Sequence, residues 1–324
     1  MSPRIPRIAG ILPSQVLTMN DRYILITAAK DEESFIEEII QSVLRQTVQP
    51  MAWFIVDDGS SDRTVPIVEG YAAKYPFIRL QTARTRGGRN FGSQYKAIQN
   101  AYEMAKSLEF EFVAVQDADQ AVEREDYYES LLDDLRKNPM LGMASGVIYE
   151  RPQGQWQSRP ENSEDSLAAS SFFRRTAYDQ VGGYVPMYYQ GSDWLIQLKV
   201  KMAGWQLETR PDLHILHYRP TSSAGGIWRG RFHAGLSDAS FGSHPIFEML
   251  KCCRRLTTRP YVLGSVVRYC GYLWWNICRR KPVISPEEIA FLRGEQAAKM
   301  RRWLWGVTGR RRNEVGRAAT SKIN

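Results

Sequence analysis

The chain has 324 residues, of which 43% are hydrophobic and 24% are charged, and these fractions are typical of soluble globular proteins. They exclude collagen-like, coiled-coil, mucin-like and wholly disordered chains, and the length is enough for two domains or for one large domain with an appendage. The net charge of +8 is concentrated at one end: residues 251–324 hold 17 Lys and Arg against 4 Glu, and such a basic segment attracts the phosphates of a nucleic acid or of an anionic membrane.

Residues 1–20 form an N-terminal extension before the first predicted element. Their apolar run, residues 8–12, is interrupted by Pro13 and is too short for the hydrophobic region of a signal peptide, so we expect the protein to stay where it is made. Residues 23–27 are apolar and β-prone, which predicts a buried strand. From Phe35 to Leu44 apolar residues recur every three or four positions, which predicts an amphipathic helix with Asp31 as its N-cap.

The alternation of strands and helices continues along the chain. The patterns predict strands over residues 53–56, 77–80 and 110–115, and helices over residues 64–74 and 91–106. Strands that alternate with helices of about 10 to 15 residues predict right-handed crossovers and a mostly parallel sheet with helices on both faces. The fold class is therefore α/β.

Polar side chains directly follow three of these strands. In α/β sheets, ligands bind in the crevice at the carboxyl ends of the strands, near the point where strand order reverses. The candidates are residues 28–33 (AAKDEE) after the first strand, Asp57 and Asp58 after the second, and Asp117 and Asp119 after the fourth. Acidic residues therefore gather where a ligand should bind.

A dinucleotide-binding site of the Rossmann type is excluded. It requires a G-x-G-x-x-G turn after the first strand, where this chain has AAKDEE. Glycines and arginines instead follow the third strand: Gly87, Gly88, Gly92, Arg84, Arg86 and Arg89. They form either a flexible basic turn or a contact to the phosphates of a nucleotide.

The acidic groups indicate a divalent metal ion. Carboxylates at the sheet edge repel the phosphates of a nucleotide unless a cation lies between them, and Mg²⁺ or Mn²⁺ binds one or two carboxylates together with substrate phosphates. Asp117 and Asp119 are separated by one residue, so one can bind the metal and the other a ribose hydroxyl or a second metal. Asp-x-Asp is common in surface turns, but its position after the apolar residues 112–115 favours the functional interpretation.

Five motifs together resemble the family 2 glycosyltransferases, which have the GT-A fold. They occur in the order and approximate spacing of that family: ILITAAKDEE at residues 24–33, IVDDGSSD at 55–62, DAD at 117–119, VGGY at 181–184 and GSDW at 191–194. The resemblance implies a doubly covered mixed sheet and a GT-A catalytic domain over residues 21–220. It also implies transfer of a sugar from a nucleoside diphosphate sugar, with a uridine diphosphate sugar as the default donor.

The resemblance further implies roles for single residues. The expected contacts to the donor nucleotide are Ala28, Glu32, Asp57, Asp58, Arg86 and Asp117, and the expected metal ligands are Asp117, Asp119 and His217. Asp193 matches the acid that removes the proton of the acceptor hydroxyl, so that the acceptor oxygen attacks the anomeric carbon in one inverting displacement. Asp193 also opens a helical pattern, and a helix N-terminus favours an ionised carboxylate.

Residues 221–324 form a basic region that we expect to be largely helical. A polar, Pro-rich stretch at about residues 151–165 predicts a long surface loop, and residues 221–226 predict a hinge. The apolar stretch 261–278 is just long enough to span a bilayer, but Arg268 in its middle would cost about 2.5–3.5 kcal/mol there. We therefore expect a helix that lies on the membrane surface or packs on the body of the protein.

All four cysteines lie in this basic region, namely Cys252, Cys253, Cys270 and Cys278. Their spacing is not the paired C-x-x-C of a zinc site, and secreted disulfide frameworks are not concentrated in this way. We expect reduced thiols in a cytoplasmic protein.

The leading hypothesis is an inverting, metal-dependent glycosyltransferase that acts on a glycan or lipid-linked acceptor at the inner face of the cytoplasmic membrane, held there by anionic lipid. Residues 244–247 and 271–275 also resemble bacterial exopolysaccharide transferases. One alternative is a nucleotidyltransferase, although the phosphate loop expected after its first strand is missing. Another is a nucleic-acid-binding protein whose basic tail tracks phosphates, but an acidic crevice does not suit that surface, so we expect no nucleic-acid partner.

Overall fold

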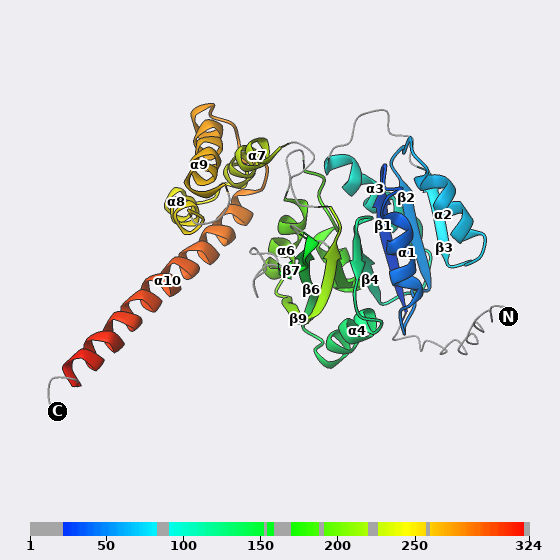
Figure 1. Ribbon diagram of the computed structural model, residues 1–324, viewed down its shortest axis with the longest axis horizontal. Coiled ribbons are helices and arrows are strands. Elements are labelled where there is room, and N and C mark those ends of the chain that lie inside the picture. The colour runs from blue at the N-terminus through cyan, green and yellow to red at the C-terminus, as the bar shows by residue number, and fades with distance from the viewer. Residues whose placement is uncertain are drawn as a thin grey trace, which may run out of the picture.

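The structure is a computed structural model that describes residues 22–82, 91–151, 154–158, 170–187, 191–219, 226–256 and 260–320, with Phe91 and residues 304–320 described by their backbone. In this part of the chain, nine strands form one sheet with helices on both faces, and a helical C-terminal region stands at one end (Figure 1). The strand order is β3-β2-β1-β4-β8-β6-β9-β5, and β7 pairs with β6 outside this path.

The elements predicted between residues 23 and 115 are confirmed to within a few residues. In chain order, the elements are β1 (Tyr23–Ala29), α1 (Ile36–Leu44), β2 (Ala52–Asp57), α2 (Thr64–Ala72), β3 (Ile78–Thr82), α3 (Phe91–Ala105), β4 (Phe112–Val115), β5 (Gln120–Val122), α4 (Tyr127–Lys137), β6 (Leu141–Glu150), β7 (Gln157–Ser158), β8 (Ser171–Arg174), α5 (Arg175–Val181), α6 (Ser192–Met202), β9 (Gln206–His217), α7 (Ile227–Ser240), α8 (Pro245–Arg254), α9 (Tyr261–Ile277) and α10 (Pro286–Thr320). The short strand β7 interrupts the predicted loop 151–165, and residues 221–225 of the predicted hinge lie outside the described part.

The sheet is mixed, as the family resemblance implies. Strands β1, β2, β3 and β4 are parallel to one another, β8 is antiparallel to both β4 and β6, and β9 is parallel to β6. Two antiparallel steps restore the original direction, so β1, β2, β4, β6 and β9 all end at the same edge. This edge carries the candidate site.

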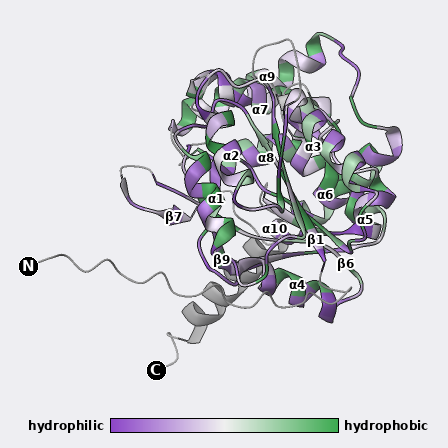
Figure 2. Ribbon diagram, turned by 90° about the vertical axis from the view of Figure 1, so that its right-hand side faces the viewer, coloured by the Kyte–Doolittle hydropathy of each residue, from purple (hydrophilic) through white to green (hydrophobic). Residues whose placement is uncertain are grey.

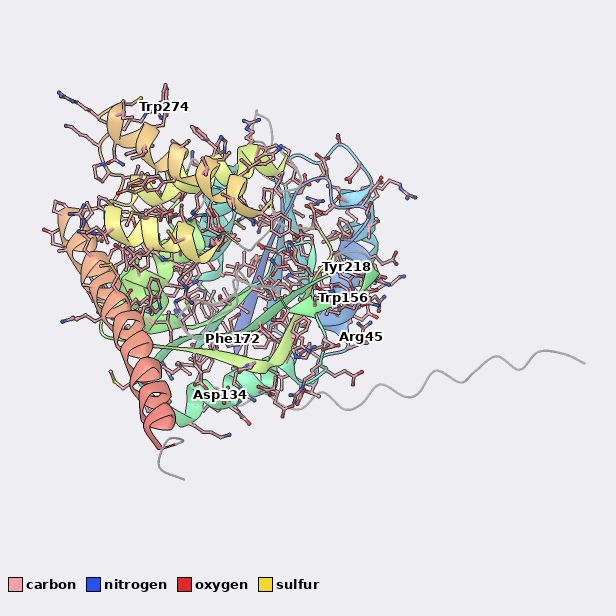
Figure 3. All side chains as sticks on the ribbon, turned by 60° about the vertical axis from the view of Figure 1, so that its left-hand side comes forward. Arg45, Asp134, Trp156, Phe172, Tyr218 and Trp274 are labelled. Carbon is pink, nitrogen blue, oxygen red and sulfur yellow. The ribbon has the colours of Figure 1, made fainter. Side chains whose placement is uncertain are left out.

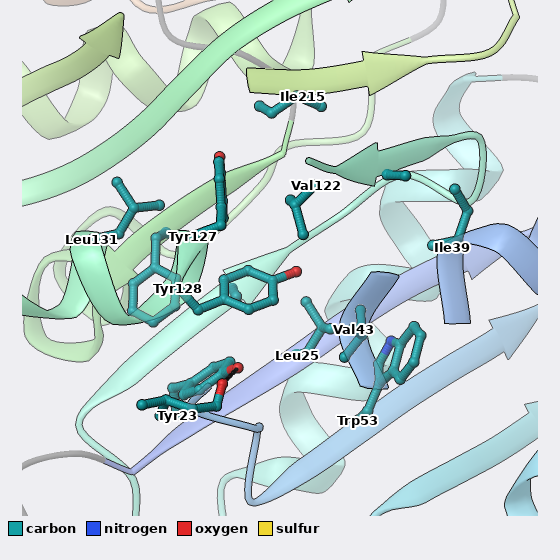
Figure 4. Packing of buried hydrophobic residues seen from close by; sticks show 14 of the residues in the cluster. Tyr23, Leu25, Ile39, Val43, Trp53, Val122, Tyr127, Tyr128, Leu131 and Ile215 are labelled. Carbon is teal, nitrogen blue, oxygen red and sulfur yellow. Dashed lines mark hydrogen bonds between the residues drawn. The ribbon is translucent and has the colours of Figure 1, made fainter. Parts of the chain in front are cut away.

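Alternate side chains of each strand enter two separate cores, because successive residues of a strand point to opposite faces. Tyr23 and Leu25 of β1 pack with Trp53 against α1 and α4, whereas Ile24 and Ile26 face α3, α5 and α6. Figure 4 shows the first core, and Figure 2 shows hydrophobic and hydrophilic residues alternating along the covering helices. The sheet is therefore buried on both faces, and polar side chains gather at its edge.

Asp31 is not the N-cap of α1, and this prediction was wrong. The helix begins at Ile36, and Phe35 precedes it without a side-chain capping bond. Asp31 has a φ of 53°, and its Oδ1 accepts hydrogen bonds from the backbone N–H and the hydroxyl of Ser61. A turn separates Asp31 from the helix, since the N–H groups of Phe35 and Ile36 both donate to the carbonyl of Glu32.

The helices α7 and α9 pack closely because glycines lie between them. A Cβ on Gly235 would lie 1.9 Å from the carbonyl oxygen of Arg268, and one on Gly271 would lie 2.2 Å from that of Phe232. A separate apolar cluster joins this region to the sheet, and its buried members are Met187, Leu195, Leu198, Phe241, Ile284 and Leu292. The first half of α10 thereby docks on α6.

The charge inside the apolar stretch 261–278 is paired within the protein. Arg268 is buried, its Nε lies 2.9 Å from Oε1 of Glu248, and its guanidinium also pairs with Asp238. Nζ of Lys251 lies 3.0 Å from Oδ1 of the same Asp238. The stretch therefore packs on the body of the protein through α9, and within the described residues every helix falls short of the length and apolar character needed to cross a bilayer.

Candidate active site

The predicted acidic residues do come together at the carboxyl edge of the sheet. In the register of the strands, Ala29 at the end of β1 pairs with Asp57 at the end of β2, and β4 ends beside β1. The charges of Glu32, Asp119, Asp193 and His217 all act on Asp117. One acidic cluster thus receives side chains from both halves of the sheet.

Asp57 and Asp58 are buried at the end of β2. The carboxylate of Asp57 accepts hydrogen bonds of 3.1 Å from the backbone N–H groups of Gly59 and Ser60, so it holds the turn in place. Gly59 has a φ of 80°, a conformation that favours glycine. The N–H of Asp58 donates to the carbonyl of Ala29. Asp57 therefore shapes the turn, and contact of either residue with a nucleoside stays a prediction.

Asp117 is held by two amide groups. The Nε2 of Gln94 donates to its Oδ1 at 2.9 Å, and the Nε2 of Gln120 donates to its Oδ2 at 3.0 Å. Burial raises the pKa of Asp117 to about 8, and the negative charges of Asp119 and Asp193 add to this shift. A cation beside these carboxylates would remove that repulsion.

His217 lies between two carboxylates at the end of β9. Its Nε2 is 3.6 Å from Oδ1 of Asp119, and its Nδ1 is 3.3 Å from Oε1 of Glu150. Burial disfavours the charged imidazole, but the hydrogen bonds to Asp119 and Glu150 outweigh it and raise the pKa of His217 to about 9. Glu150, which ends β6, thereby orients the ring toward Asp119.

Arg219 closes the side of the cluster that contains Glu32. Its Nη1 and Nη2 donate to Oε1 and Oε2 of the buried Glu32 at 3.0 and 2.6 Å, a two-pronged ion pair. Its Nε is 4.0 Å from Oδ2 of Asp119, and its guanidinium lies over the ring of Phe35. Arg219 therefore connects the segment after β9 to the loop after β1.

Asp193 lies in the first turn of α6, as predicted from the helical pattern. The hydroxyl of Tyr95 donates a hydrogen bond of 2.8 Å to its Oδ1, and the Tyr95 ring stacks on that of Tyr184 with centroids 5.0 Å apart. Burial and the nearby charge of Asp193 raise the pKa of Tyr95 well above its ordinary value, so the phenol keeps its proton and remains a donor. Asp193 is thus oriented by a residue of α3 that lies 98 positions earlier in the chain.

The donor set fits a hard divalent cation in its chemistry. Asp119 and His217 already lie side by side, and Asp117 follows the same strand end. In the described parts of the chain, no three His, Cys, Asp or Glu side chains converge on one point as a metal site, and the amides of Gln94 and Gln120 hold Asp117. Magnesium and manganese often take few protein carboxylates and complete their shell with substrate phosphates and water. Asp119, with Asp117 and His217, would hold such an ion.

The remaining predictions are placed as follows. Ala28 lies in β1 opposite Val56, next to the site, and Arg86 lies outside the described residues. Sequence reasoning missed Gln94, Tyr95, Glu150 and Arg219. Of these, Glu150 ends a strand at the same edge, so the rule that polar groups at strand ends form the site could have found it.

The sequence pattern of Glycosyl transferase family 2 matches residues 24–200. Two curated relatives, both poly-beta-1,6-N-acetyl-D-glucosamine synthases of Staphylococcus epidermidis, are 27% identical to this chain over 225 residues. The match covers 64% of this chain and 52% of each relative, so the chain spans about half the length of the curated relatives it matches.

Several solved glycosyltransferases share the architecture. The mannosyltransferase PcManGT from Pyrobaculum calidifontis, in complex with GDP-Man and Mn²⁺, is 17% identical with a TM-score of 0.54 over 87% of this chain and 82% of its own. The TarS of S. aureus in complex with UDP-GlcNAc is 14% identical with a TM-score of 0.51 over 84% and 78%. At such identities the likeness shows the fold, which is GT-A, and together with the family pattern over more than half of the sequence it places the chain in glycosyl transferase family 2.

Proposed function

We propose that the protein transfers a sugar from a nucleoside diphosphate sugar to a hydroxyl group of a glycan or lipid-linked acceptor. The observation that carries the proposal is the pair of contacts from α3: Gln94 holds Asp117, and Tyr95 holds Asp193. Asp117 belongs to the acidic cluster, which with a bound cation suits a nucleotide. Asp193 is the carboxylate that would take the proton of the acceptor hydroxyl. Two carboxylates with different proposed roles are thus held by consecutive residues of one helix.

The reaction is a single displacement with inversion at the anomeric carbon. The acceptor oxygen forms a bond to this carbon as the bond to the diphosphate oxygen breaks, and the nucleoside diphosphate leaves with the bonding electron pair. Asp193 takes the proton of the acceptor hydroxyl, a role typically worth about 10²–10⁴-fold in rate. Asp119, with Asp117 and His217, would hold a divalent ion, which would supply Lewis-acid stabilisation of the leaving diphosphate.

The side chains around Asp193 and Asp119 keep these groups in place. Tyr95 fixes the carboxylate of Asp193 in one orientation, which positions it for the acceptor hydroxyl. Glu150 fixes the imidazole of His217, so that its other nitrogen faces Asp119. The ion pair between Arg219 and Glu32 holds the loop after β1, where the nucleoside is expected.

For the donor and acceptor we propose UDP-N-acetylglucosamine, or another UDP-sugar, and a growing exopolysaccharide. The curated relatives are named for a polymer of N-acetylglucosamine, and the structure of TarS was determined with UDP-GlcNAc. The structure of PcManGT contains Mn²⁺, which supports manganese or magnesium as the metal.

For the location we propose the inner face of the cytoplasmic membrane. The catalytic part, residues 21–220, would be held there by the basic part, residues 221–324. Residues 251–324 carry 13 more positive than negative charges, and each Lys or Arg close to an anionic surface contributes about 1 kcal/mol. The enzyme would then work where lipid-linked acceptors are found.

The test is a panel of nucleotide sugars incubated with the purified protein and a glycan acceptor, with and without EDTA. We expect release of nucleoside diphosphate from one donor class, coupled to a β-configured product from an α-configured donor, and loss of both on chelation. Release that continues in EDTA would contradict the metal, retention of configuration would contradict the single displacement, and no release from any donor would contradict the proposed function.

A further inference from the structure

The helix α9 has two faces with an unusual distribution of residues. Its buried face consists of small and polar residues together with two aromatic ones: Gly264, Ser265, Arg268, Gly271, Tyr272 and Trp275. This face packs on α7 and α8 through the glycines and the ion pairs of Arg268. The space between α7, α8 and α9 is therefore filled by other residues, and the long aliphatic side chains of α9 lie outside it.

These aliphatic side chains lie on the opposite, exposed face. Its members are Val262 (53% exposed), Leu263 (63%), Val266 (49%), Leu273 (40%), Trp274 (53%) and Ile277 (72%). Successive members are one, three or seven positions apart, and the exposed Cys270 lies within the seven-residue step, so they form one stripe along the helix. We call this set the outer face of α9. Figure 3 shows Trp274 at the outer edge of the molecule, away from Trp156 and Tyr218.

An apolar stripe of this length on the surface indicates a binding surface. Single exposed hydrophobic residues are normal, but contiguous apolar patches on soluble proteins mark sites of contact with other molecules or with membranes. Amphipathic helices normally bury their apolar face. Because the apolar outer face of α9 is exposed, we expect another molecule to cover it.

The charge around the outer face indicates what this partner is. Between Glu248 and Glu287 the chain contains eight Lys and Arg and no Asp or Glu, and two of the eight, Lys251 and Arg268, pair inside the protein with Asp238. Arg279, Arg280 and Lys281 are exposed directly after the last turn of α9. A strip of this kind, apolar along its length and basic beside it, matches a surface that is apolar beneath a layer of negative charge.

Aromatic residues stand near both ends of the outer face. Tyr261 begins α9 and is 54% exposed, and Trp274 lies in the last turn. Tyr and Trp prefer the boundary between lipid headgroups and hydrocarbon, because one part of each ring system is apolar and the other is polar. A second copy of the chain would place basic residues against basic residues, which disfavours a dimer through this face.

We propose that the outer face of α9 inserts into the headgroup layer of an anionic phospholipid bilayer, with α9 parallel to the membrane plane. This deepens the membrane location proposed above and rests on it for its biological setting. Leu263, Trp274 and Ile277 would enter the acyl boundary, and Arg279, Arg280 and Lys281 would contact lipid phosphates. The helix lies along the surface, so its buried face stays on α7.

The test is co-sedimentation of the full chain with vesicles of phosphatidylcholine alone or with 30% phosphatidylglycerol, a composition we choose to give a strong negative surface (about one charged lipid in three). We expect the double variant Leu263→Gln/Trp274→Gln to lower the partition coefficient on the anionic vesicles by about ten-fold or more. The matched control is Met104→Gln/Met140→Gln, because both methionines are about half exposed on the sheet part, at 51% and 52%. Quenching by brominated lipid, compared between the natural chain and Trp274→Phe, reports whether Trp274 enters the bilayer.

Donor turnover of every variant is measured in lipid-free buffer, so failure of the membrane proposal is separable from failure of the proposed function. The proposal is overturned if the double variant sediments like the natural chain, if the control loses as much binding, or if neutral vesicles bind as well as anionic ones. It is also overturned if the natural chain is a dimer in lipid-free sedimentation velocity and the double variant is a monomer. Vesicle binding without any donor turnover would instead contradict the transferase.

Discussion

The hydroxyl of Tyr95 donates a hydrogen bond of 2.8 Å to Oδ1 of Asp193. The preceding residue, Gln94, donates to Asp117 at 2.9 Å, so consecutive residues of α3 hold one acid from each half of the sheet. Asp117 lies after β4 and Asp193 at the start of α6. The distance between Asp117 and the proposed base is therefore set by one helix.

The substitution Tyr95→Phe should lower kcat by about 10- to 100-fold with little effect on the KM for the donor. It removes one hydrogen bond to a charged carboxylate, worth about 1.5–3 kcal/mol, and leaves the ring stack on Tyr184 in place. Tyr102→Phe is the matched control, because its hydroxyl bonds Asp179 from the same helix, away from the cluster. Steady-state kinetics measure both, and an equal loss in Tyr102→Phe would show that the effect is merely structural.

The substitution Asp193→Asn should abolish transfer but keep donor binding. The amide cannot accept the proton of the acceptor hydroxyl, so kcat should fall by about 10²–10⁴-fold. In the proposed mechanism Asp193 acts on the acceptor and not on the nucleotide, so the dissociation constant for the nucleoside diphosphate in calorimetry should change by less than about three-fold. Loss of nucleotide binding would instead assign Asp193 to the donor side.

The first half of the fold could be predicted from the sequence because each strand there is an apolar run that ends at a turn. In the second half, the helical pattern that begins at Asp193 predicts α6, but strand β6 could not be predicted. Strand β6 contains Gly142 and Gly146, which usually indicate turns. They are needed for close approach: a Cβ on Gly146 would lie 2.2 Å from the carbonyl oxygen of Leu213, and one on Gly142 would lie 2.7 Å from the Cβ of Trp205. Tertiary packing, which no local pattern reveals, determines these residues.

The same difference applies to the site. Asp117, Asp119 and Asp193 could be predicted, since strand ends and helix starts are visible in the pattern and the family motifs contain them. Tyr95 and Arg219 could not be predicted. A tyrosine on an amphipathic helix is usually interpreted as a core residue, and a lone arginine after a strand is usually interpreted as a surface charge. Their roles depend on partners about 100 and 190 residues away in sequence.

The ion pair between Arg219 and Glu32 should stabilise the fold. Glu32 is 3% exposed, so Arg219→Met leaves a buried charge without its main partner and should cost about 3 kcal/mol. Adding Glu32→Gln should restore a large part of this loss. The midpoint and slope of urea unfolding measure both variants. Arg63→Met is the control: its pair with Glu33 is exposed, so the change should stay below about 0.5 kcal/mol. Additive losses in the double variant would contradict the coupling.

The pairing of Asp238 should make stability depend on pH on the acid side. Burial alone would raise its pKa, but the charges of Arg268 and Lys251 outweigh it and lower the pKa of Asp238 to about 2, against 3.8 ordinarily. A lowered carboxyl pKa stabilises the fold fully above about pH 4 and ceases to do so as the pH falls toward 2.

Asp238→Asn should therefore reduce the free energy of unfolding by about 2 kcal/mol at pH 7, and the difference from the natural chain should shrink at pH 3. Denaturant midpoints at both values measure this, with Asp133→Asn as the control because its pair with Arg136 is exposed. A difference that is the same at pH 7 and pH 3 would show that the loss comes from packing. The opposite shift of Glu248, whose pKa burial raises, belongs to the same group and reduces the net slope.

The cysteines should differ in reactivity although two of them are neighbours in sequence. Cys252 is buried on α8, and burial, followed by the charge of Glu248, raises its pKa to about 11, whereas Cys253, Cys270 and Cys278 are exposed. Since the thiolate is the reactive form, iodoacetamide at pH 8 should label the three exposed cysteines of the native protein within minutes and leave Cys252 unmodified for hours. Peptide mass spectrometry measures the labelling, and the pair Cys252 and Cys253 provides an internal control, because both should react alike once urea unfolds the chain. Rapid labelling of Cys252 in the native protein would show that α8 separates readily from α7 and α9, and that the buried ion pairs do not hold the helices under the outer face together.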